Sequence, residues 1–234
     1  LMGLFDMGFD TESSFQVLPA KANDETDSAL FGLNGAIKRA LDLALVIPAL
    51  LFLLPVFVII AILIKVEGGP LLYRQIRIGR DGQRFSMLKF RTMHVDAEQR
   101  LVRLMAHCPD TKAEWDAFQK LRRDPRVTRC GDFLRRTSLD ELPQLLNILM
   151  GDMSLVGQRP ILPSQRDAYG LHIYGYERAR PGLTGLWQVS GRNSLTFEDR
   201  AALGSDYINR WSLWLDIKLI LLTVPTVLFS RDAF

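Results

Sequence analysis

The feature that most constrains this chain is a run of 22 residues without a charged side chain between Asp42 and Lys65, which reads LALVIPALLFLLPVFVIIAILI. As a straight α-helix this run is about 33 Å long, which is enough to cross the hydrocarbon core of a bilayer. A surface helix of a water-soluble protein normally keeps a polar stripe, and this segment has none. The sequence therefore predicts a membrane-embedded helix over 34–66.

The topology of this helix is less constrained. Basic residues stand on both sides of the run, at Lys38, Arg39, Lys65, Arg74 and Arg77. Because Lys and Arg concentrate on the cytoplasmic side, this pattern favours two cytoplasmic ends. Pro55 removes a backbone hydrogen bond near the middle of the run and bends the helix there. A bend permits re-entry on the same side, but proline-kinked helices also span membranes, so both topologies stay open.

The remainder of the chain has the composition of a folded domain, since 48% of all residues are hydrophobic. Residues 1–33 are polar and acidic, which predicts a mobile N-terminal extension. The net charge is +3, and the basic surplus lies downstream of that extension. Such a surface suits anionic lipids, nucleotides or nucleic acid. Nucleic acid is the poor fit, because the basic residues come in short groups without a recognisable binding motif.

The expected elements after the membrane segment are short. Two β-prone runs near 71–78 and 84–90 flank Asp81-Gly82, which predicts a β-hairpin. Residues 96–122 are predicted to be helical with a break at Pro109, as are 138–150 and 197–208, while 151–195 is expected to be mostly loop. The apolar run 211–229 begins with two tryptophans and carries Asp216 and Lys218, so we expect an interfacial helix, with a core helix as the alternative. Cys108 and Cys130 are predicted to be free thiols.

The strongest candidate for chemistry is the acidic pair Asp140-Glu141. Thr137 or Ser138 can cap a helix that starts here, and Ser138 with Glu141 fits a capping box. The helix dipole and the preceding Arg135 and Arg136 then favour ionised carboxylates. Such a pair can bind Mg²⁺ together with substrate phosphates, or one member can attack phosphorus. A capped helix with solvated charges is the simpler interpretation.

Basic side chains lie in segments suited to phosphate binding. Lys89 and Arg91 alternate along one predicted strand and so share a face. Arginine binds phosphate with two parallel hydrogen bonds, and glycine allows the backbone N–H groups to come close. The candidates in Gly-rich loops are Arg159, Arg178, Arg180 and Arg192. Neither a Walker A motif nor GxGxxG is present.

Taken together and in this order, KRALDLALVIPALLFLLP, KFRTM, DPRVTR, RRTSLDELPQLLNILMGDMSLVGQRP and RPGLTGLWQVSGRN resemble the bacterial sugar transferase family, the monotopic phosphoglycosyl transferases. The resemblance runs from Lys38 almost to the C-terminus. It implies an α/β, mostly α fold with a re-entrant N-terminal membrane helix and a small β-hairpin. The compact cytoplasmic catalytic domain, 67–234, would carry interfacial amphipathic helices and lie on the inner membrane.

The resemblance also assigns roles to residues. It implies that Asp140 is the nucleophile and that Glu141 helps to hold Mg²⁺. The family's membrane segment breaks at Ser-Pro, where this chain has Leu54-Pro55. Its Gly-Pro-Arg-Pro loop is Gly157-Gln158-Arg159-Pro160 here, so the phosphate-binding arginine is kept and one rigid proline is lost.

The implied reaction moves hexose 1-phosphate from a UDP-hexose, either UDP-glucose or UDP-galactose, to polyprenyl phosphate with release of UMP. It passes through a phosphosugar–aspartyl intermediate and begins exopolysaccharide assembly. The expected partners are the nucleotide sugar, the lipid phosphate and membrane lipids, and homo-oligomerisation is left open. Two alternatives remain: a membrane-bound glycosyltransferase that releases UDP, and a non-enzymatic scaffold for polysaccharide assembly.

Overall fold

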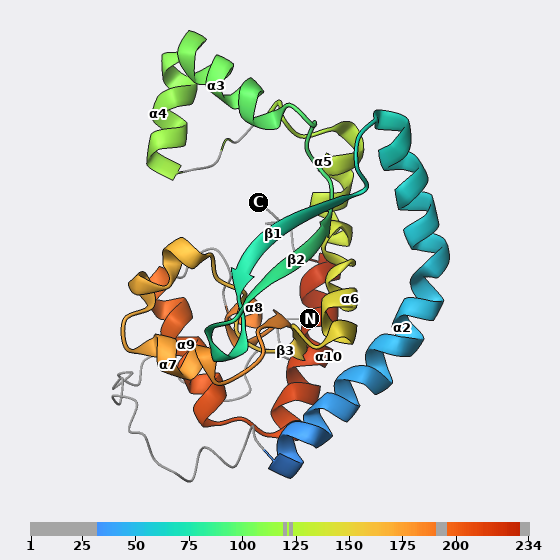
Figure 1. The fold of residues 1–234 in the computed structure, drawn as a ribbon, viewed down its shortest axis with the longest axis vertical. Helices are drawn as coiled ribbons and strands as arrows, with labels where there is room; N and C mark the ends of the chain where they lie inside the picture. Colours follow the sequence, from blue (N-terminus) through green and yellow to red (C-terminus); the bar gives the residue numbers. More distant parts are fainter. Residues whose placement is uncertain (1–31, 119–120, 122–123, 191–195, 230–234) are drawn as a thin grey trace.

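The computed structural model describes residues 32–118, 121, 124–190 and 196–229. The predicted N-terminal extension lies almost entirely outside these residues. Most of the described chain is helical (Figure 1). The main helices and strands are α2 (Gly32–Glu67), β1 (Leu72–Ile78), β2 (Arg84–Phe90), α3 (Ala97–His107), α4 (Pro109–Phe118), α5 (Arg129–Arg136), α6 (Gln144–Met150), β3 (Ser154–Val156), α7 (His172–Glu177), β4 (Gly182–Thr184), α8 (Leu186–Val189), α9 (Phe197–Asn209) and α10 (Leu213–Phe229). Short 3₁₀ turns stand at Arg80–Gly82, Leu139–Glu141, Pro163–Gln165 and Asp167–Tyr169.

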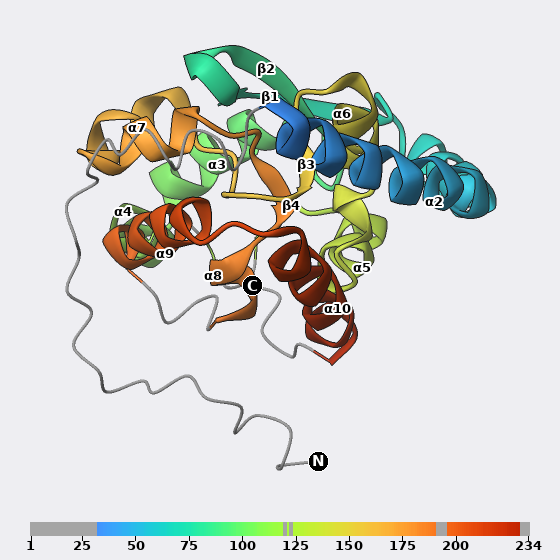
Figure 2. The same ribbon diagram turned by 90° about the horizontal axis from the view of Figure 1, so that it is seen from below.

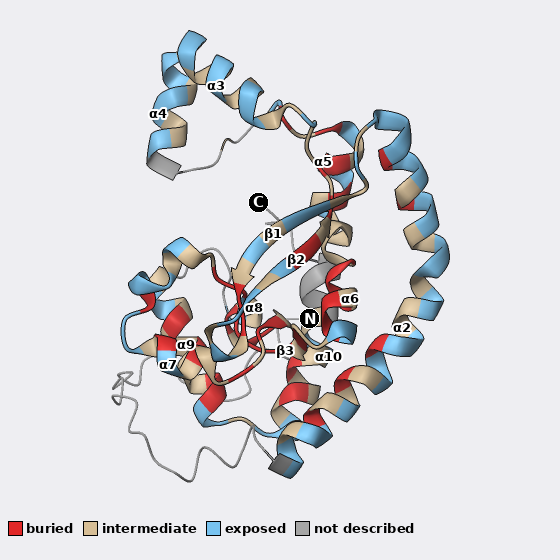
Figure 3. Ribbon diagram, viewed as in Figure 1, coloured by how far each residue is buried: buried red, intermediate tan, exposed pale blue. Residues whose placement is uncertain are grey.

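The apolar run forms part of α2, which is one uninterrupted helix with Pro48 and Pro55 inside it. It is long and apolar enough to cross a membrane, and it follows a curved path along the outside of the molecule (Figures 1 and 2). Only 11% of its most apolar 18-residue stretch is buried inside the molecule (Figure 3). Leu51 and Phe52 are 71% and 83% exposed. A soluble core helix would bury such side chains, so this surface supports membrane association. The re-entrant topology stays a prediction.

The predicted hairpin is confirmed. Strands β1 and β2 pair antiparallel from Leu72 opposite Phe90 to Ile78 opposite Arg84. Asp81 and Gly82 both have positive φ in the connecting turn, where glycine and aspartate are tolerated best. Phe90 packs with Ile60 and Ile64, so the hairpin contacts the second half of α2.

The segment predicted to be mostly loop contains a two-stranded parallel sheet, β3–β4. Its two strands have three residues each, too few for an alternating pattern to stand out in the sequence. Val156 of β3 packs with Tyr207 of α9 and Leu219 of α10. The sheet therefore joins the C-terminal helices to the centre of the domain.

Helices α3, α4, α9 and α10 lie in or close to predicted helical segments, whereas α5 was not predicted, and α7 and α8 lie in the segment that was expected to be mostly loop. Helix α4 begins at the predicted break, Pro109, and α3 and α4 extend away from the rest of the molecule (Figure 1). Helix α10 buries Asp216 and Leu219, whereas Trp214 and Leu221 are 71% and 64% exposed. One face of α10 is thus a core face, while an apolar group of side chains stays outside. Cys108 and Cys130 are free, as predicted.

Candidate active site

The Asp140-Glu141 pair lies on a tight turn between α5 and α6, which differs from the predicted capped helix. Ser138 has φ 56° and ψ 14°, a left-handed conformation, and its side chain makes no capping bond. Thr137 donates to the carbonyl oxygens of Phe133 and Leu134 and so closes α5. The capping box prediction is therefore wrong. The left-handed Ser138 interrupts the helical conformation after α5, and the acidic pair occupies a 3₁₀ turn over Leu139–Glu141 before α6 begins.

Lys89 on β2 is the basic residue that lies against the acidic pair. Its Nζ lies 2.6 Å from Glu141 Oε1 and 3.8 Å from Asp140 Oδ2. The three side chains are 20%, 30% and 13% exposed respectively, so solvent reaches them only in part. Coulomb interactions are stronger in such a partly dry site than in bulk water. Strand β2 thus places one ammonium group between two carboxylates.

Asp140 has its pKa raised, which corrects the expectation that its surroundings favour ionisation. Burial is the main cause, because it removes water from the charged carboxylate. Lys89 is the largest opposing influence, Glu141 raises the pKa further, and Arg135 lowers it. Arg135 itself donates from Nε to Thr92 Oγ1 at 2.9 Å, and burial lowers its pKa. The two predicted cations Lys89 and Arg135 therefore both act on Asp140.

A buried asparagine, which the sequence did not single out, fixes the distance between strand and turn. Asn147 on α6 is fully buried. Its Oδ1 accepts from the backbone N–H of Leu88 at 2.9 Å, and its Nδ2 donates to the carbonyl oxygen of Ser86 at 2.8 Å. These bonds join α6 to β2 directly beside Lys89. The only sequence signal was a polar residue on the apolar face of a short helix.

Arg77 was also missed as a site residue, although it had been noted as a charge flanking the membrane run. Its guanidinium donates to the carbonyl oxygen of Pro160 at 3.0 Å and to Gln75 Oε1 at 2.6 Å. Burial and then the neighbouring Arg159 lower its pKa, while Glu141 raises it. Arg77 is therefore bonded to the loop that carries Arg159, and Glu141 is near enough to influence its pKa. The alternation of polar residues along β1 was the available signal.

The predicted loop arginine, Arg159, stands exposed at the end of β3. Its guanidinium carbon lies 5.5 Å from the centre of the Trp187 ring, and that of Arg200 lies 5.0 Å from the same ring. Gln158, which replaces a proline of the family loop, is 4% exposed, and its amide has no hydrogen-bond partner among the described residues. The loop is held instead through its backbone, by hydrogen bonds to β4.

The glycines of this region serve the sheet, which corrects their predicted role of exposing N–H groups to phosphate. The N–H of Gly157 donates to Thr184 at 2.9 Å, and that of Gly182 donates to Gln158 at 2.7 Å. A Cβ on Gly182 would lie 2.1 Å from the nitrogen of Gly157. Glycine is therefore required because two backbones touch here.

Several of the predicted basic residues do not contact the acidic pair in the structure. Arg136 pairs with Asp132 at 2.6 Å on the exposed face of α5. Arg91 follows the end of β2, and its buried Nε has no hydrogen-bond partner within the described part of the chain. Arg180 donates to the carbonyl oxygen of Gly151, near Arg39 and Arg80. Arg192 lies outside the described residues.

A divalent metal would find few protein ligands here. Across the described residues, no group of three or more His, Cys, Asp and Glu side chains is arranged to hold a metal. Two adjacent carboxylates fit Mg²⁺ nonetheless, because Mg²⁺ commonly binds one or two carboxylates and takes its other ligands from water and substrate phosphates. The donor set of Asp140 and Glu141 is therefore compatible with Mg²⁺ that arrives together with a phosphorylated substrate.

The structure thus combines a membrane-length apolar helix on the outside of a small domain with a partly buried acidic pair beside the basic Lys89. Residues 33–230 match the Bacterial sugar transferase family, and the chain belongs to that family.

Named relatives agree with this membership. The chain is 43% identical over 211 residues to the exopolysaccharide production protein ExoY of Rhizobium meliloti, covering 90% of this chain and 93% of the relative. It is 41% identical over 229 residues to a UDP-galactose-lipid carrier transferase of Erwinia amylovora, covering 98% of this chain and 47% of the relative. It is 40% identical over 217 residues to a UDP-glucose:undecaprenyl-phosphate glucose-1-phosphate transferase of Escherichia coli K12, covering 89% of this chain and 44% of the relative. The chain thus spans about half the length of several curated relatives and nearly all of ExoY.

Proposed function

We propose that the chain transfers hexose 1-phosphate from a UDP-hexose to a polyprenyl phosphate, with Asp140 as nucleophile, on the cytoplasmic face of the bacterial inner membrane. The observation that carries the proposal is the geometry around Asp140. Its carboxylate is partly buried beside Lys89 and Arg135, in a chain whose α2 presents an exposed apolar surface. Relatives named for lipid carrier and undecaprenyl-phosphate transfer support the choice of acceptor.

The first step is nucleophilic attack at phosphorus. A carboxylate oxygen of Asp140 forms a bond to the β-phosphorus of the UDP-hexose, and the bond from that phosphorus to the bridging oxygen breaks. UMP leaves with the bonding electron pair, and a phosphosugar–aspartyl ester remains. In the second step an oxygen of the polyprenyl phosphate attacks the same phosphorus and frees the carboxylate. The product is a polyprenyl diphosphate sugar.

The surrounding side chains have distinct tasks in these steps. Lys89 and Arg135 favour the ionised, attacking form of Asp140 against the effect of burial. Arg77 and Arg159 add positive charge on the side of the Gly157–Pro160 loop, where phosphate oxygens gain negative charge. Mg²⁺ held by Glu141 and the substrate phosphates would supply further charge neutralisation. Fixed positive charge is usually the main contribution of a protein to phosphoryl transfer.

The two alternatives lack comparable support. In a glycosyltransferase reaction that releases UDP, the acceptor attacks the anomeric carbon of the sugar. Such an enzyme does not need a side chain positioned to attack phosphorus. A scaffold has no need of a partly buried aspartate with a raised pKa, since removing a charge from water costs stability. Neither explains why β2, α5 and α6 converge on one carboxylate.

Nucleotide release tests the proposal directly. The detergent-solubilised chain is mixed with Mg²⁺, undecaprenyl phosphate and either UDP-glucose or UDP-galactose, and UMP and UDP are measured separately. Lipid-dependent UMP release is expected, and the better donor identifies the sugar. UDP release would instead establish glycosyl transfer, and release of neither nucleotide by a folded sample would favour the scaffold.

Asp140→Asn is the matched variant for this assay. It keeps the size of the side chain and removes the nucleophile, so turnover should fall below a few per cent of the unmodified rate. It should also leave the fold intact and raise the free energy of unfolding by roughly 1 kcal/mol, because it no longer buries a charge. Retained activity would exclude Asp140 as the nucleophile.

A further inference from the structure

A second group of arginines gathers at the start of α2, around a cavity of about 310 Å³. Its lining comes from α2, the hairpin turn, β3 and the α7–β4 connection, and comprises Gly35, Ala36, Lys38, Arg39, Asp42, Arg80, Ser154, Arg178, Ala179 and Arg180. The turn that carries Arg80 and the end of β2 that carries Lys89 are separated by one strand, or roughly 20 Å. The cavity is therefore distinct from the acidic pair.

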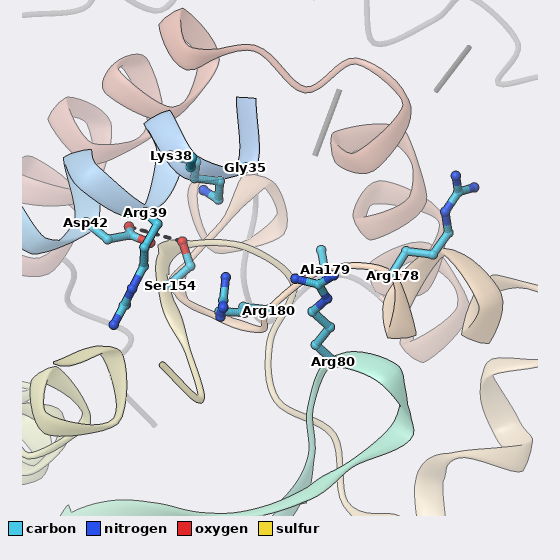
Figure 4. A pocket seen from close by; sticks show the side chains of 10 residues that line it. Gly35, Lys38, Arg39, Asp42, Arg80, Ser154, Arg178, Ala179 and Arg180 are labelled. Atoms are coloured by element: carbon cyan, nitrogen blue, oxygen red, sulfur yellow. Dashed lines mark hydrogen bonds between the residues drawn. The ribbon is translucent and has the colours of Figure 1, made fainter. Parts of the chain in front are cut away.

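The charge of this cavity is strongly positive. Five basic side chains line it, and Asp42 is the one acid among the lining residues; Arg80 also pairs through Nε with Asp81, at 3.3 Å. The Asp42 carboxylate is already engaged, because its Oδ1 accepts from Ser154 Oγ at 3.1 Å and from the N–H of Leu155 at 3.0 Å. Burial lowers the pKa of Arg180, as do the like charges of Arg80 and Arg39, while Asp42 and Asp81 act in the opposite direction. Figure 4 shows these three arginine side chains arriving from three separate parts of the fold.

Part of this arrangement has a purely structural purpose. Arg39 donates to the carbonyl oxygens of Ile148 and Leu149, and Arg180 donates from Nε to that of Gly151 at 2.7 Å. Both residues thus satisfy the C-terminal end of α6, where carbonyl groups lack helical partners. That role does not involve Arg80, and it engages only the Nε of Arg180. Among the hydrogen bonds of the described residues, none uses the Nη atoms of Arg180. Charge-assisted donors of this kind suit an anion.

The position of the cavity indicates where such an anion comes from. Lys38, Arg39 and Asp42 immediately precede the uncharged run that begins at Leu43. If that run enters the bilayer, the cavity lies at the depth of the lipid headgroups. Basic pockets at this depth on membrane proteins bind the phosphates of anionic lipids.

We propose that this cavity is a second phosphate-binding site, formed by Arg39, Arg80 and Arg180, and that its position favours the headgroup of an anionic phospholipid. A bound headgroup offsets the repulsion that Arg39 and Arg80 exert on Arg180. It also holds the start of α2 and the end of α6 at a fixed depth in the interface. The site lies apart from Asp140 and needs no turnover.

The test measures lipid binding by the full chain in detergent micelles, with calorimetry or native mass spectrometry. The probes are short-chain phosphatidylglycerol, short-chain phosphatidylcholine and inorganic phosphate. The variants are Arg80→Gln and the double variant Arg80→Gln/Arg180→Gln. Arg80 is chosen for the single variant because, unlike Arg39 and Arg180, it does not bond to the C-terminal end of α6. The control Arg84→Gln/Arg210→Gln removes two exposed arginines outside the cavity. Thermal unfolding checks that each variant is folded.

We expect phosphatidylglycerol to bind the unmodified chain and the control equally, and the dissociation constant to rise about tenfold or more in the double variant. Arg80→Gln alone should weaken binding in the same direction. If inorganic phosphate binds with the same dependence on the variants, the site stands and its ligand is a free phosphate compound. Equal binding of phosphatidylglycerol and phosphatidylcholine, or unchanged binding in both folded variants, would overturn the proposal. Because no step uses Asp140 or a nucleotide sugar, the result is independent of the proposed reaction.

Discussion

Replacing Lys89 by methionine should move the acid limb of the pH–rate profile to higher pH. Lys89 is the largest influence that lowers the pKa of Asp140, while burial and Glu141 both raise it. Without the ammonium group the carboxyl holds its proton more tightly. A protonated carboxyl is a poor nucleophile, so the variant needs a higher pH to reach the same ionised fraction. The change therefore acts through ionisation as well as through any loss of substrate contact.

The size of the effect follows from the geometry. The 3.8 Å between Lys89 Nζ and Asp140 Oδ2 corresponds to an attraction of ~1 kcal/mol in bulk water and ~4 kcal/mol at the effective dielectric constant of a protein site. Because the two side chains are 20% and 13% exposed, an intermediate value of ~2 kcal/mol is reasonable. On the acid limb this energy corresponds to about a 30-fold lower rate at fixed pH.

The assay is lipid-dependent UMP release, with kcat and KM measured across the acid range. Lys89→Arg keeps the charge and should keep the limb near its original position. Arg84→Met removes an exposed charge from the same strand and serves as the matched control. If the acid limb of kcat for Lys89→Met stays where it was, or moves to lower pH, then Lys89 does not control the ionisation of Asp140.

Three further predictions concern the framework of the site. Asn147→Ala leaves two backbone groups of β2 without their Asn147 partner. Calorimetry should show the free energy of unfolding fall by roughly 2–3 kcal/mol, and activity should also fall; an unchanged free energy of unfolding would show that these hydrogen bonds do not stabilise the fold. Lys38→Met removes the cation that pairs with the buried Asp216 and should lower the free energy of unfolding by roughly 3–5 kcal/mol, much of it recovered in Lys38→Met/Asp216→Leu; equal losses in both would argue against an ion-pair effect. Cysteines placed at positions 36 and 68, in a chain without its native thiols, should react from the same side of the membrane, and labelling from opposite sides would mean that α2 spans.

Local sequence patterns were sufficient where a short segment settles its own structure. The absence of charge from 43 to 64 predicted a long apolar helix, and the structure places α2 there with its apolar side chains outside. The turn residues Asp81 and Gly82 predicted the hairpin, because few residue types tolerate positive φ. The Asp140-Glu141 pair and Lys89 stood out as candidates by residue type alone.

Only the tertiary structure decided which candidates meet. Lys89 and Asp140 are far apart in sequence, and they come together because Asn147 bonds β2 to α6. Packing also reversed the expected effect on Asp140, since burial depends on what covers the turn and not on its neighbours in the chain. For the same reason Arg180 was separated from the acidic pair and placed beside Arg39 and Arg80. The sequence determined which charged side chains exist. Long-range packing determined which of them lie together in partly buried sites, where their charges interact.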